Sequence, residues 1–390
     1  MTRICYVFTG YPAPTEVFGE VEMQSLLDKG VDLSIVSIRS QNRGRLNSVD
    51  NCLLRKVKYS EASWDFSLFV MFIINPRLFF ESVLFMGRVS KSFGEFLRLL
   101  LVSGRCYEIS KYIKGEGFDL VHLFWGHYPS LINFFLKRGH FDGKISTFVG
   151  AYDLTGGAGI MKWGVNNSDF VFTHAKANID DIKIFYQGAL NVLYRGVNCV
   201  SYSYEKSRIQ NEPVFAFSGR LITGKRPLMA LELFSHVKTS YPSAKLHIFG
   251  DGPMLKEVLK KIHDLKLADN VVLHGHVTQK AMFEIFKEVD FFLFPSVHTS
   301  ERLPNVVKES MLLGCVPVVS YSPGIDELVV HGVNGVIDEF YDLPALAADI
   351  IHLVVNSEKY EGFSSAAREK VLKCFNNDEL AEDRLKIWFG

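Results

Sequence analysis

The fold is decided by one stretch of the chain, FPSVHTSERLPNVVKESMLLGCVPVV, which covers residues 294–319. The end of an apolar run is followed by a polar loop that carries Glu301 and then by residues with helical periodicity. Pro304 stands where the first turn of a helix tolerates proline, and Gly314 follows the helical period as a common helix-ending residue. A second apolar run then covers 316–320. Strand, loop, helix and strand in this order are typical of α/β folds with parallel sheets.

The same alternation continues outward in both directions. Strands are predicted over 4–8, 32–37, 120–124, 145–149, 170–173, 214–218, 246–249, 271–273, 291–294 and 316–320. Helices between the later strands are predicted over 227–237, 254–265, 279–289 and 305–313. We therefore predict an α/β protein with two Rossmann-like doubly wound domains, 1–197 and 213–375, joined by a linker over 198–212. The helix over 376–390 is expected to return to the first domain.

One region breaks the alternation. Residues 64–114 are helical in period and rich in Phe, Leu and Met, and 77–114 holds seven basic residues against three acidic ones. Basic and aromatic residues on an amphipathic helix bind anionic membrane surfaces, so a peripheral membrane contact is one expectation. The alternative is that these helices only cover the first sheet, with Lys and Arg facing solvent.

Composition narrows the function classes. Lys+Arg and Asp+Glu are both 43 in 390 residues, so no excess charge favours a nucleic-acid partner. Six scattered cysteines without a CxxC pair indicate neither a zinc site nor a disulfide framework, and they favour a reducing cytosol. The longest apolar stretch stops at Asn75-Pro76, well short of the ~20 residues that a membrane-spanning helix needs. We expect a cytoplasmic protein, peripheral on the inner face of the cell membrane if 64–114 binds lipid.

The stretch GRLITGK, residues 219–225, fits the phosphate-loop pattern G-x-x-x-x-G-K. Arg226 stands where that loop needs a Ser or Thr for Mg²⁺, Pro227 fixes the helix start, and no later strand ends in the expected metal-binding Asp. These departures argue against a nucleotide hydrolase. Arg220 and Lys225 instead leave a strand end together, where they can neutralise a diphosphate by charged hydrogen bonds.

Glu301 and Glu309 form an E-x7-E motif, and further short motifs surround it in the order in which one enzyme family carries them. These are GRL with Lys225 (219–225), FGDGP (249–253), VLHG (272–275), LFPS (293–296), GIDE (324–327) and GVNG (332–335). Over roughly 214–336 the chain resembles the family 4 retaining glycosyltransferases. More loosely, YPAPTEVF at 11–18 and AYDL at 151–154 resemble bacterial members that build exopolysaccharide and lipopolysaccharide. The resemblance implies the GT-B fold, whose two domains face a central cleft.

The resemblance also implies a role for each matching residue. Arg220 and Lys225 would hold the diphosphate of a nucleotide-sugar donor and stabilise the charge that grows on it as the sugar leaves. Glu301 would face the donor sugar near its reacting carbon, and Glu309 would accept hydrogen bonds from the ribose diol. Gly10 would face the donor phosphates. The remaining donor contacts would come from Leu303, Pro304, Asn305 and Val306. No cofactor and no obligatory metal are implied, and the acceptor would be a glycan or a polyprenyl-linked sugar.

The first half departs from the family pattern at one position. Family members carry a histidine ahead of the segment that holds Asp153, whereas this chain has Gly150 there. Asp153 is therefore a candidate catalytic residue, with Tyr152 as a neighbour that could substitute for the histidine. Three other histidines are expected to pack or to lie in loops: His122, His127 and His276.

Together these features predict a retaining, hexosyltransferase-type enzyme of bacterial surface polysaccharide biosynthesis. Two alternatives stay open. A GT-B nucleotide-sugar epimerase would use the same donor grip without an acceptor, and a catalytically inactive homologue would only bind the nucleotide sugar. The complete set of Arg220, Lys225, Glu301 and Glu309 favours the transferase. Sugar, nucleotide base, acceptor and linkage are not determined by these motifs.

Overall fold

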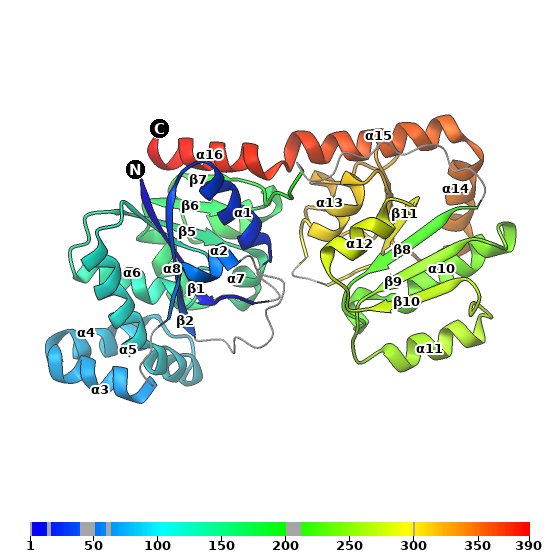
Figure 1. The fold of residues 1–390 in the computed structure, drawn as a ribbon. Helices are drawn as coiled ribbons and strands as arrows, with labels where there is room; N and C mark the ends of the chain where they lie inside the picture. Colours follow the sequence, from blue (N-terminus) through cyan, green and yellow to red (C-terminus); the bar gives the residue numbers. More distant parts are fainter. Residues whose placement is uncertain (1, 14–16, 40–50, 60–63, 200–211, 299–300) are drawn as a thin grey trace. The chain divides into compact units, whose positions relative to one another are not determined.

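The computed structural model describes residues 2–13, 17–39, 51–59, 64–199, 212–298 and 301–390. The chain forms two compact units (Figure 1). The first consists of Met1–Gly196 together with Asn377–Gly390, and the second of Val197–Asn376. The chain therefore leaves its first unit near residue 197 and re-enters it with the last helix.

In its described part, the first unit has one parallel sheet in the order β3-β2-β1-β4-β5-β6-β7. The strands are β1 (Arg3–Gly10), β2 (Asp32–Arg39), β3 (Val57–Tyr59), β4 (Leu120–Leu123), β5 (Lys144–Val149), β6 (Phe170–Thr173) and β7 (Leu190–Val192). The helices are α1 (Val17–Asp28), α2 (Asn51–Arg55), α3 (Trp64–Ile74), α4 (Pro76–Val89), α5 (Phe93–Glu116), α6 (Pro129–Arg138), α7 (Ala151–Gly156), α8 (Gly159–Asn166), α9 (Ile179–Lys183) and α16 (Asn377–Phe389).

Both faces of this sheet are buried. Alternate residues of a strand point to opposite faces, and in β1 Cys5 and Val7 join a core with α5 and α6, while Tyr6 and Phe8 join another with α16. Continuous apolar strands are what a sheet covered on both sides requires. On the α16 side, the buried Trp388 donates from Nε1 to Ser146 Oγ at 3.1 Å.

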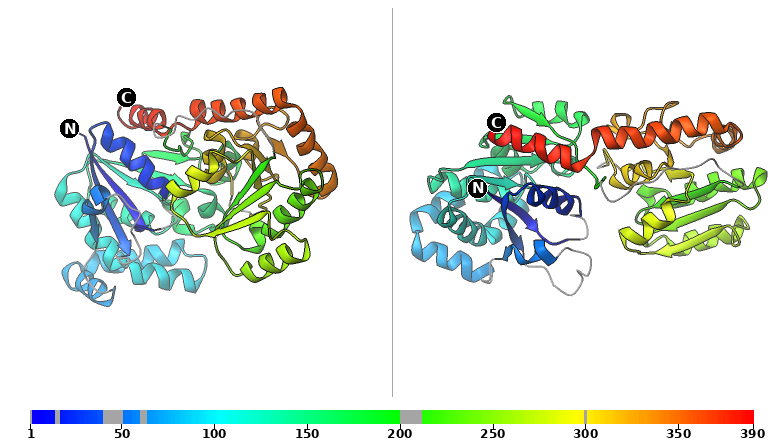
Figure 2. Two further views of the ribbon diagram at one scale, coloured as in Figure 1. Left: turned by 45° about the vertical axis from the view of Figure 1, so that its right-hand side comes forward. Right: turned by 45° about the horizontal axis from the view of Figure 1, so that its top comes forward.

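Helices α3 and α4 lie outside this sandwich. They pack on α5, which in turn packs on α6 and β2. All the views in Figures 1 and 2 put α3 and α4 at the outer edge of the first unit. Helices α3–α5 therefore form a layer that projects from the first unit, and within this layer α5 packs against β2 and α6.

The described part of the second unit holds a parallel sheet in the order β10-β9-β8-β11-β12-β13. Its strands are β8 (Val214–Ser218), β9 (Lys245–Phe249), β10 (Val271–Gly275), β11 (Phe291–Phe294), β12 (Val316–Val319) and β13 (Val336–Ile337). Its α-helices are α10 (Pro227–Ser240), α11 (Leu255–Asp264), α12 (Gln279–Phe286), α13 (Asn305–Leu312), α14 (Leu343–Val355) and α15 (Ser357–Cys374). Phe291 and Leu293 face the core lined by α10 and α14, and Phe292 contacts Phe286 of α12 on the opposite face at 5.5 Å between ring centroids.

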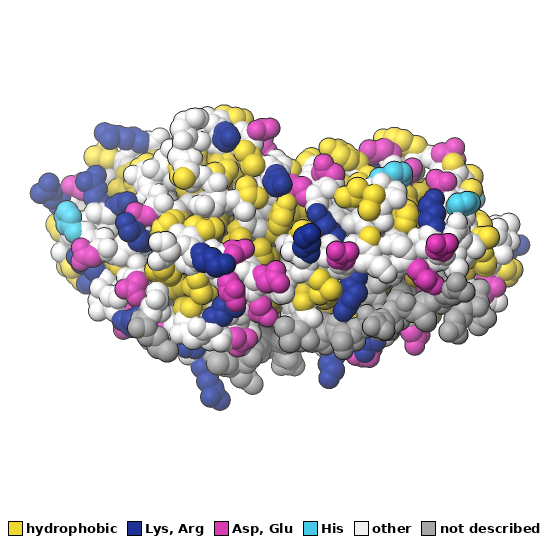
Figure 3. Space-filling model, turned by 90° about the horizontal axis from the view of Figure 1, so that it is seen from above, with side chains coloured by type: hydrophobic (Ala, Val, Ile, Leu, Met, Phe, Trp, Pro, Cys, Tyr) yellow, Lys and Arg dark blue, Asp and Glu magenta, His cyan; other side chains and the backbone are white. Residues whose placement is uncertain are grey.

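Every predicted strand is present, with ends that differ by up to two residues. Three further strands, β3, β7 and β13, are only two or three residues long and lie at or beside sheet edges. So short a strand carries no recognisable apolar run. On the face shown in Figure 3, acidic and basic side chains are interspersed, in keeping with equal numbers of both charges.

Candidate active site

The loop after β8 is held against the loop after β9 by their backbones. Gly219 N donates to Phe249 O at 3.0 Å, and Leu221 N donates to Asp251 O at 3.0 Å. Gly250 adopts a φ of 117°, and a Cβ there would lie 2.0 Å from the carbonyl oxygen of Gly219. Glycine is therefore required at 250, both for its conformation and for the close approach of the two chains. This packing fixes the direction in which the segment with Arg220 leaves the sheet.

Lys225 and Glu301 form an ion pair between the carboxyl ends of β8 and β11. Their side chains are only 17% and 18% exposed, and the Lys225 ammonium also lies 4.8 Å from the centroid of the Phe294 ring. Burial lowers the pKa of Lys225 to about 8, while the adjacent carboxylate favours the charged form. The other carboxylate oxygen, Oε2 of Glu301, is buried and has no hydrogen-bond partner among the described residues.

The backbone after Lys225 does not follow a phosphate loop. Thr223–Lys225 form a 3-10 turn, and Arg226 adopts the left-handed conformation with a φ of 49°. The next helix, α10, starts at Pro227, which has no amide hydrogen to donate. The loop therefore cannot present the uninterrupted amides of a helix start to a phosphate, and the exclusion made from the sequence agrees with this geometry.

Glu309 lies on α13, which directly follows the loop that carries Glu301, and it accepts a hydrogen bond from Gln279 Nε2 at 2.6 Å. Burial raises the pKa of Glu309 to about 7, against the opposing effects of the Gln279 hydrogen bond and the Lys308 charge. Gln279 is the first residue of α12, so Glu309 connects two helices at this end of the sheet.

The residues that were predicted to contact the donor through a helix start, 303–306, lie around the first turn of α13. Leu303 is buried, Pro304 is the N-cap rather than a first-turn residue, and α13 begins at Asn305. Asn305 Oδ1 accepts from Lys308 Nζ at 3.1 Å. The amides of Asn305 and Val306 belong to the first turn, where helical N–H groups have no partner within the helix. They are available to an anionic or hydroxyl ligand.

A cavity of about 390 Å³ lies beside this cluster. Arg220 lines it together with the loops after β9 and β10 and with α12; the other lining residues are Ser218, Gly219, Phe249, Gly250, Asp251, Gly275, His276, Val277 and Met282. Arg220 itself is exposed. Arg220, which was predicted to hold the diphosphate, thus borders a cavity that is lined largely by apolar side chains and backbone atoms.

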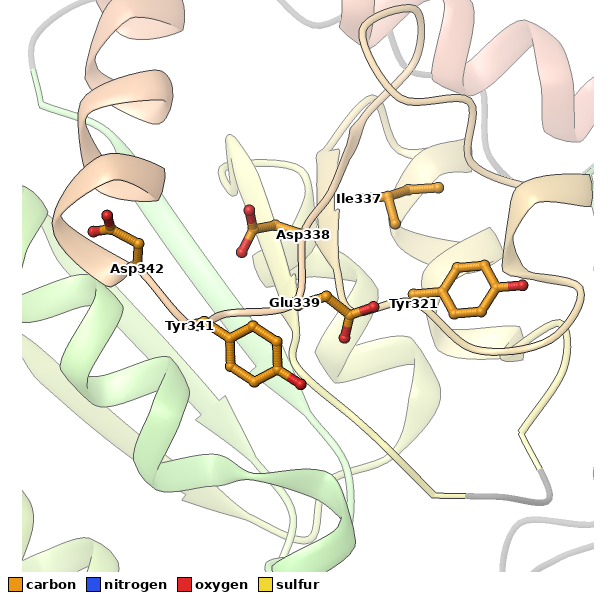
Figure 4. A pocket seen from close by; sticks show the side chains of 6 residues that line it. All are labelled: Tyr321, Ile337, Asp338, Glu339, Tyr341 and Asp342. Atoms are coloured by element: carbon orange, nitrogen blue, oxygen red, sulfur yellow. The ribbon is translucent and has the colours of Figure 1, made fainter.

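A second cavity, of about 440 Å³, lies farther along the sheet near β12 and β13 (Figure 4). Its lining combines two tyrosines with three carboxylates: Tyr321, Ile337, Asp338, Glu339, Tyr341 and Asp342. Asp338 Oδ1 accepts from the Phe340 amide, and Asp342 Oδ1 accepts from the Ala345 amide at 3.0 Å. Two of the carboxylates therefore serve local backbone structure, and none of the predicted site residues lines this cavity.

In the first unit, Gly10 ends β1 and Asp153 lies in the first turn of α7, which follows β5. Both therefore stand at the carboxyl end of the sheet, where open α/β sheets bind ligands. The Asp153 side chain is fully buried. Its Oδ2 accepts from Gly150 N at 3.0 Å, and its Oδ1 lies 2.9 Å from His127 Nδ1.

His127 is the residue that sequence reasoning missed. It was expected to be a packing or loop residue, yet it follows β4 just as Asp153 follows β5, and the two side chains meet. The signal that could have found it is its position directly after a buried strand. His122, in contrast, lies within β4 and is fully buried, in agreement with its predicted packing role.

Comparison with known proteins places this geometry in context. Residues 203–370 match the model of the family described as "Glycosyl transferases group 1". The chain is similar to a poly(glycerol-phosphate) alpha-glucosyltransferase of Bacillus subtilis, at 35% identity over 150 residues that cover 38% of this chain and 22% of the relative. It is also similar to the amylovoran biosynthesis glycosyltransferase AmsK of Erwinia amylovora, at 29% identity over 192 residues that cover 48% and 47%. The chain thus spans less than half the length of these two curated relatives.

Among solved structures, the fold is similar to that of Anabaena HepE in complex with UDP. The TM-score is 0.73 at 14% sequence identity, and the match covers 99% of both chains. At this identity the likeness concerns the fold alone. It confirms the predicted α/β architecture of two Rossmann-like domains.

Proposed function

We propose that the chain is a group 1 glycosyl transferase, the family whose model matches its residues 203–370, and that it transfers a sugar from a nucleotide-sugar donor to a glycan acceptor. The names of its relatives support a place in bacterial surface polysaccharide biosynthesis. The alternatives of an epimerase or of an inactive binding homologue find no specific support in the geometry.

One observation carries the proposal: Lys225 and Glu301 share a mostly buried ion pair that leaves a second carboxylate oxygen without a partner among the described residues. An unsatisfied buried oxygen is costly unless a ligand completes it. In our proposal a hydroxyl of the donor sugar donates to Glu301 Oε2, while Lys225 and Arg220 hold the diphosphate. The two cations stabilise the charge that develops on the leaving group.

We assign the nucleoside to the adjacent cavity and to Glu309. The cavity of about 390 Å³ has the size of small-molecule sites and is bordered by Arg220. A nucleoside whose base occupies this cavity would therefore place its diphosphate beside Arg220. Glu309 would then accept from the ribose hydroxyls, because burial, which raises the pKa of Glu309 to about 7, deprives its carboxylate of solvation. Hydrogen bonds from a ribose diol would restore that solvation.

The reaction we propose is displacement at the anomeric carbon with retention of configuration. The bond from that carbon to the diphosphate oxygen breaks, a bond to the acceptor oxygen forms, and the acceptor's proton passes to the leaving diphosphate. The positive charge of Lys225 and Arg220 lets the diphosphate depart without a metal ion. The first unit, with Gly10 and Asp153 at the carboxyl end of its sheet, is assigned to the acceptor.

The acceptor in this proposal is a glycan on a polyprenyl carrier, because the projecting α3–α5 layer presents a surface suited to lipid. Ten large apolar side chains there are between 40% and 74% exposed: Phe66, Phe69, Phe72, Ile73, Ile74, Phe80, Leu84, Phe93, Leu97 and Leu101. Apolar exposure on this scale marks an interaction site. Exposed basic residues of the same layer accompany it, among them Arg77, Arg88, Lys91 and Arg98. No helix among the described residues is long and apolar enough to span a bilayer.

We therefore assign the protein to the cytoplasmic face of an anionic membrane, with this layer in the headgroup region. Flotation with vesicles that contain anionic lipid tests the assignment. The triple variant Arg88→Glu, Lys91→Glu and Arg98→Glu should lose binding, because each basic residue near an anionic surface contributes about 1 kcal/mol. Unchanged flotation of that variant would remove the electrostatic part of the assignment.

The transferase itself is tested by screening nucleotide sugars for thermal stabilisation, since a ligand that binds only the folded state raises its melting temperature. The stabilising donor is then incubated with a glycan or polyprenyl-linked acceptor and the products are analysed. A glycosylated acceptor supports the transferase. Conversion of the donor sugar to its epimer without an acceptor would instead identify an epimerase, and binding without any turnover an inactive homologue.

A further inference from the structure

A polar cavity of about 340 Å³ lies in the first unit, where α4 begins and α6 ends. Arg138 is the last residue of α6, and β5 begins shortly after it at Lys144. The cavity is therefore at the amino end of the sheet, opposite the end that carries Gly10 and Asp153. Its lining residues are Asn75, Arg77, Leu78, Glu81, Arg138 and His140.

Two arginines from different helices face one carboxylate in this cavity. Arg77 Nε donates to Glu81 Oε1 at 3.2 Å, and Arg138 Nε lies 3.8 Å from Glu81 Oε2. The Arg138 guanidinium also lies over the Phe134 ring, 5.6 Å from its centroid. Each guanidinium has further N–H donors on Nη1 and Nη2, and for both arginines these have no partner among the described residues. Glu81 thus aligns the two cations through Nε and leaves their Nη groups for a ligand.

The remaining groups of the cavity fit a phosphate ligand. Two guanidinium groups against one carboxylate leave an excess of positive charge, and His140 adds an imidazole. Asn75 Oδ1 accepts from Leu78 N at 3.1 Å, so the amide group of Asn75 is the part left to donate. The backbone of α4 adds little, because Pro76 has no N–H and the Leu78 amide is capped. Arginines bind phosphate oxygens through paired N–H donors, so the side chains carry the site.

The side chains next to this cavity are apolar and exposed. Residues three, four and seven apart share a helix face, so Phe80 and Leu84 lie on the same face of α4 as Arg77. Phe80 is 57% exposed and Leu84 is 64% exposed. Phe72 of α3 lies 6.1 Å from Phe80 between ring centroids, so the apolar surface continues across both helices. A free phosphate would use only the polar cavity, whereas a lipid would use the cavity and this surface together.

Resting on the membrane contact that belongs to the function proposed above, we propose that this cavity binds the phosphate group of an anionic lipid headgroup. Arg77 and Arg138 hold the phosphate, and Phe80 and Leu84 enter the boundary between headgroups and acyl chains. The α3–α5 layer then recognises a chemical group and not only a negative surface charge.

Flotation of the full chain tests this with two kinds of phosphatidylcholine vesicle adjusted to equal zeta potential. One kind contains phosphatidate, which presents a phosphate monoester, and the other contains cholesteryl hemisuccinate, whose charge is a carboxylate. The wild type should bind the phosphatidate vesicles about tenfold more tightly, because charged hydrogen bonds to the phosphate add to the general attraction. Arg77→Gln/Arg138→Gln should lose this preference. The matched control Arg88→Gln/Arg98→Gln removes the same charge from the same layer and should weaken binding to both kinds of vesicle alike.

Glu81→Gln separates recognition of the phosphate from charge. This change removes a negative charge, so a purely electrostatic surface would bind both kinds of vesicle more tightly and keep the same ratio between them. If Glu81 aligns the two arginines, the preference for phosphatidate should instead fall. Millimolar glycerol phosphate, added at constant ionic strength, should leave most of the wild-type protein on phosphatidate vesicles, because it cannot make the apolar contacts.

Each other outcome counts against the inference. Equal binding of the wild type to both kinds of vesicle, or a preference that survives in Arg77→Gln/Arg138→Gln, would overturn it and leave the membrane contact standing. Release by glycerol phosphate would assign the cavity to a free phosphate compound instead. If the double variant loses its cooperative thermal transition, Arg77→Gln alone decides, because this side chain is 90% exposed and its loss should already reduce the preference.

Failure of the inference can be told apart from failure of the proposed transferase. A wild type that binds no vesicle would end the inference and the membrane contact together. Flotation uses neither a donor nor an acceptor, so the transferase is judged separately by the nucleotide-sugar screen.

Discussion

The Lys225–Glu301 pair offers the sharpest test of the donor site. Replacing Lys225 with Met keeps most of the side-chain volume and removes the ammonium. A charged hydrogen bond contributes about 1.5–3 kcal/mol, so the dissociation constant for the nucleotide-sugar donor should rise roughly ten- to hundredfold. Because both side chains are more than four-fifths buried, loss of one partner should also destabilise the fold by about 3–5 kcal/mol.

Calorimetry with the donor and thermal unfolding measure the two effects separately. The double variant Lys225→Met/Glu301→Gln removes both charges, so it should regain much of the stability but none of the donor affinity. Lys287→Met is the matched control, because Lys287 pairs with Glu284 at 2.6 Å on an exposed part of the second unit. Exposed pairs contribute at most about 1 kcal/mol. Donor affinity of Lys225→Met within threefold of the wild type would refute the role of this cation.

Three further predictions follow from the same geometry. The pKa of Glu309 is raised to about 7 in the folded state, so the folded protein keeps a proton that the unfolded chain releases from about pH 4.5. The free energy of unfolding should therefore fall as the pH rises toward 7. Glu309→Gln should flatten this slope in urea titrations at several pH values. Gly150→Ala should cost about 1–3 kcal/mol through overpacking against Trp125; chemical denaturation measures the loss, and Trp125→Leu in the same chain should recover part of it. Transfer activity should survive EDTA, because Arg220 and Lys225 provide the positive charge for the diphosphate; abolition by EDTA and recovery with Mg²⁺ would contradict this.

Local sequence was sufficient for much of the fold. Apolar runs with helical periods between them predicted ten of the strands described here, because a strand buried on both faces must be apolar throughout. The segment around Glu301 and Glu309 was equally readable, since its strand, loop, helix start and helix-ending glycine are all specified by neighbours in the chain. Strands β3, β7 and β13 escaped prediction because two or three residues carry no pattern.

Side-chain partnerships lay beyond the sequence. Periodicity tells which face of an element is buried, but it does not tell which side chains from different loops meet at the end of a sheet. Lys225 and Glu301 were each predicted as site residues, yet their pairing depends on β8 and β11 being neighbours in the sheet. His127 was passed over because its partner Asp153 belongs to the next strand's loop, and Trp125 closes position 150 only through packing. The chain alone thus determined the architecture and the candidate residues, whereas the tertiary structure decided their partners, because strand order brings together loops that are far apart in the sequence.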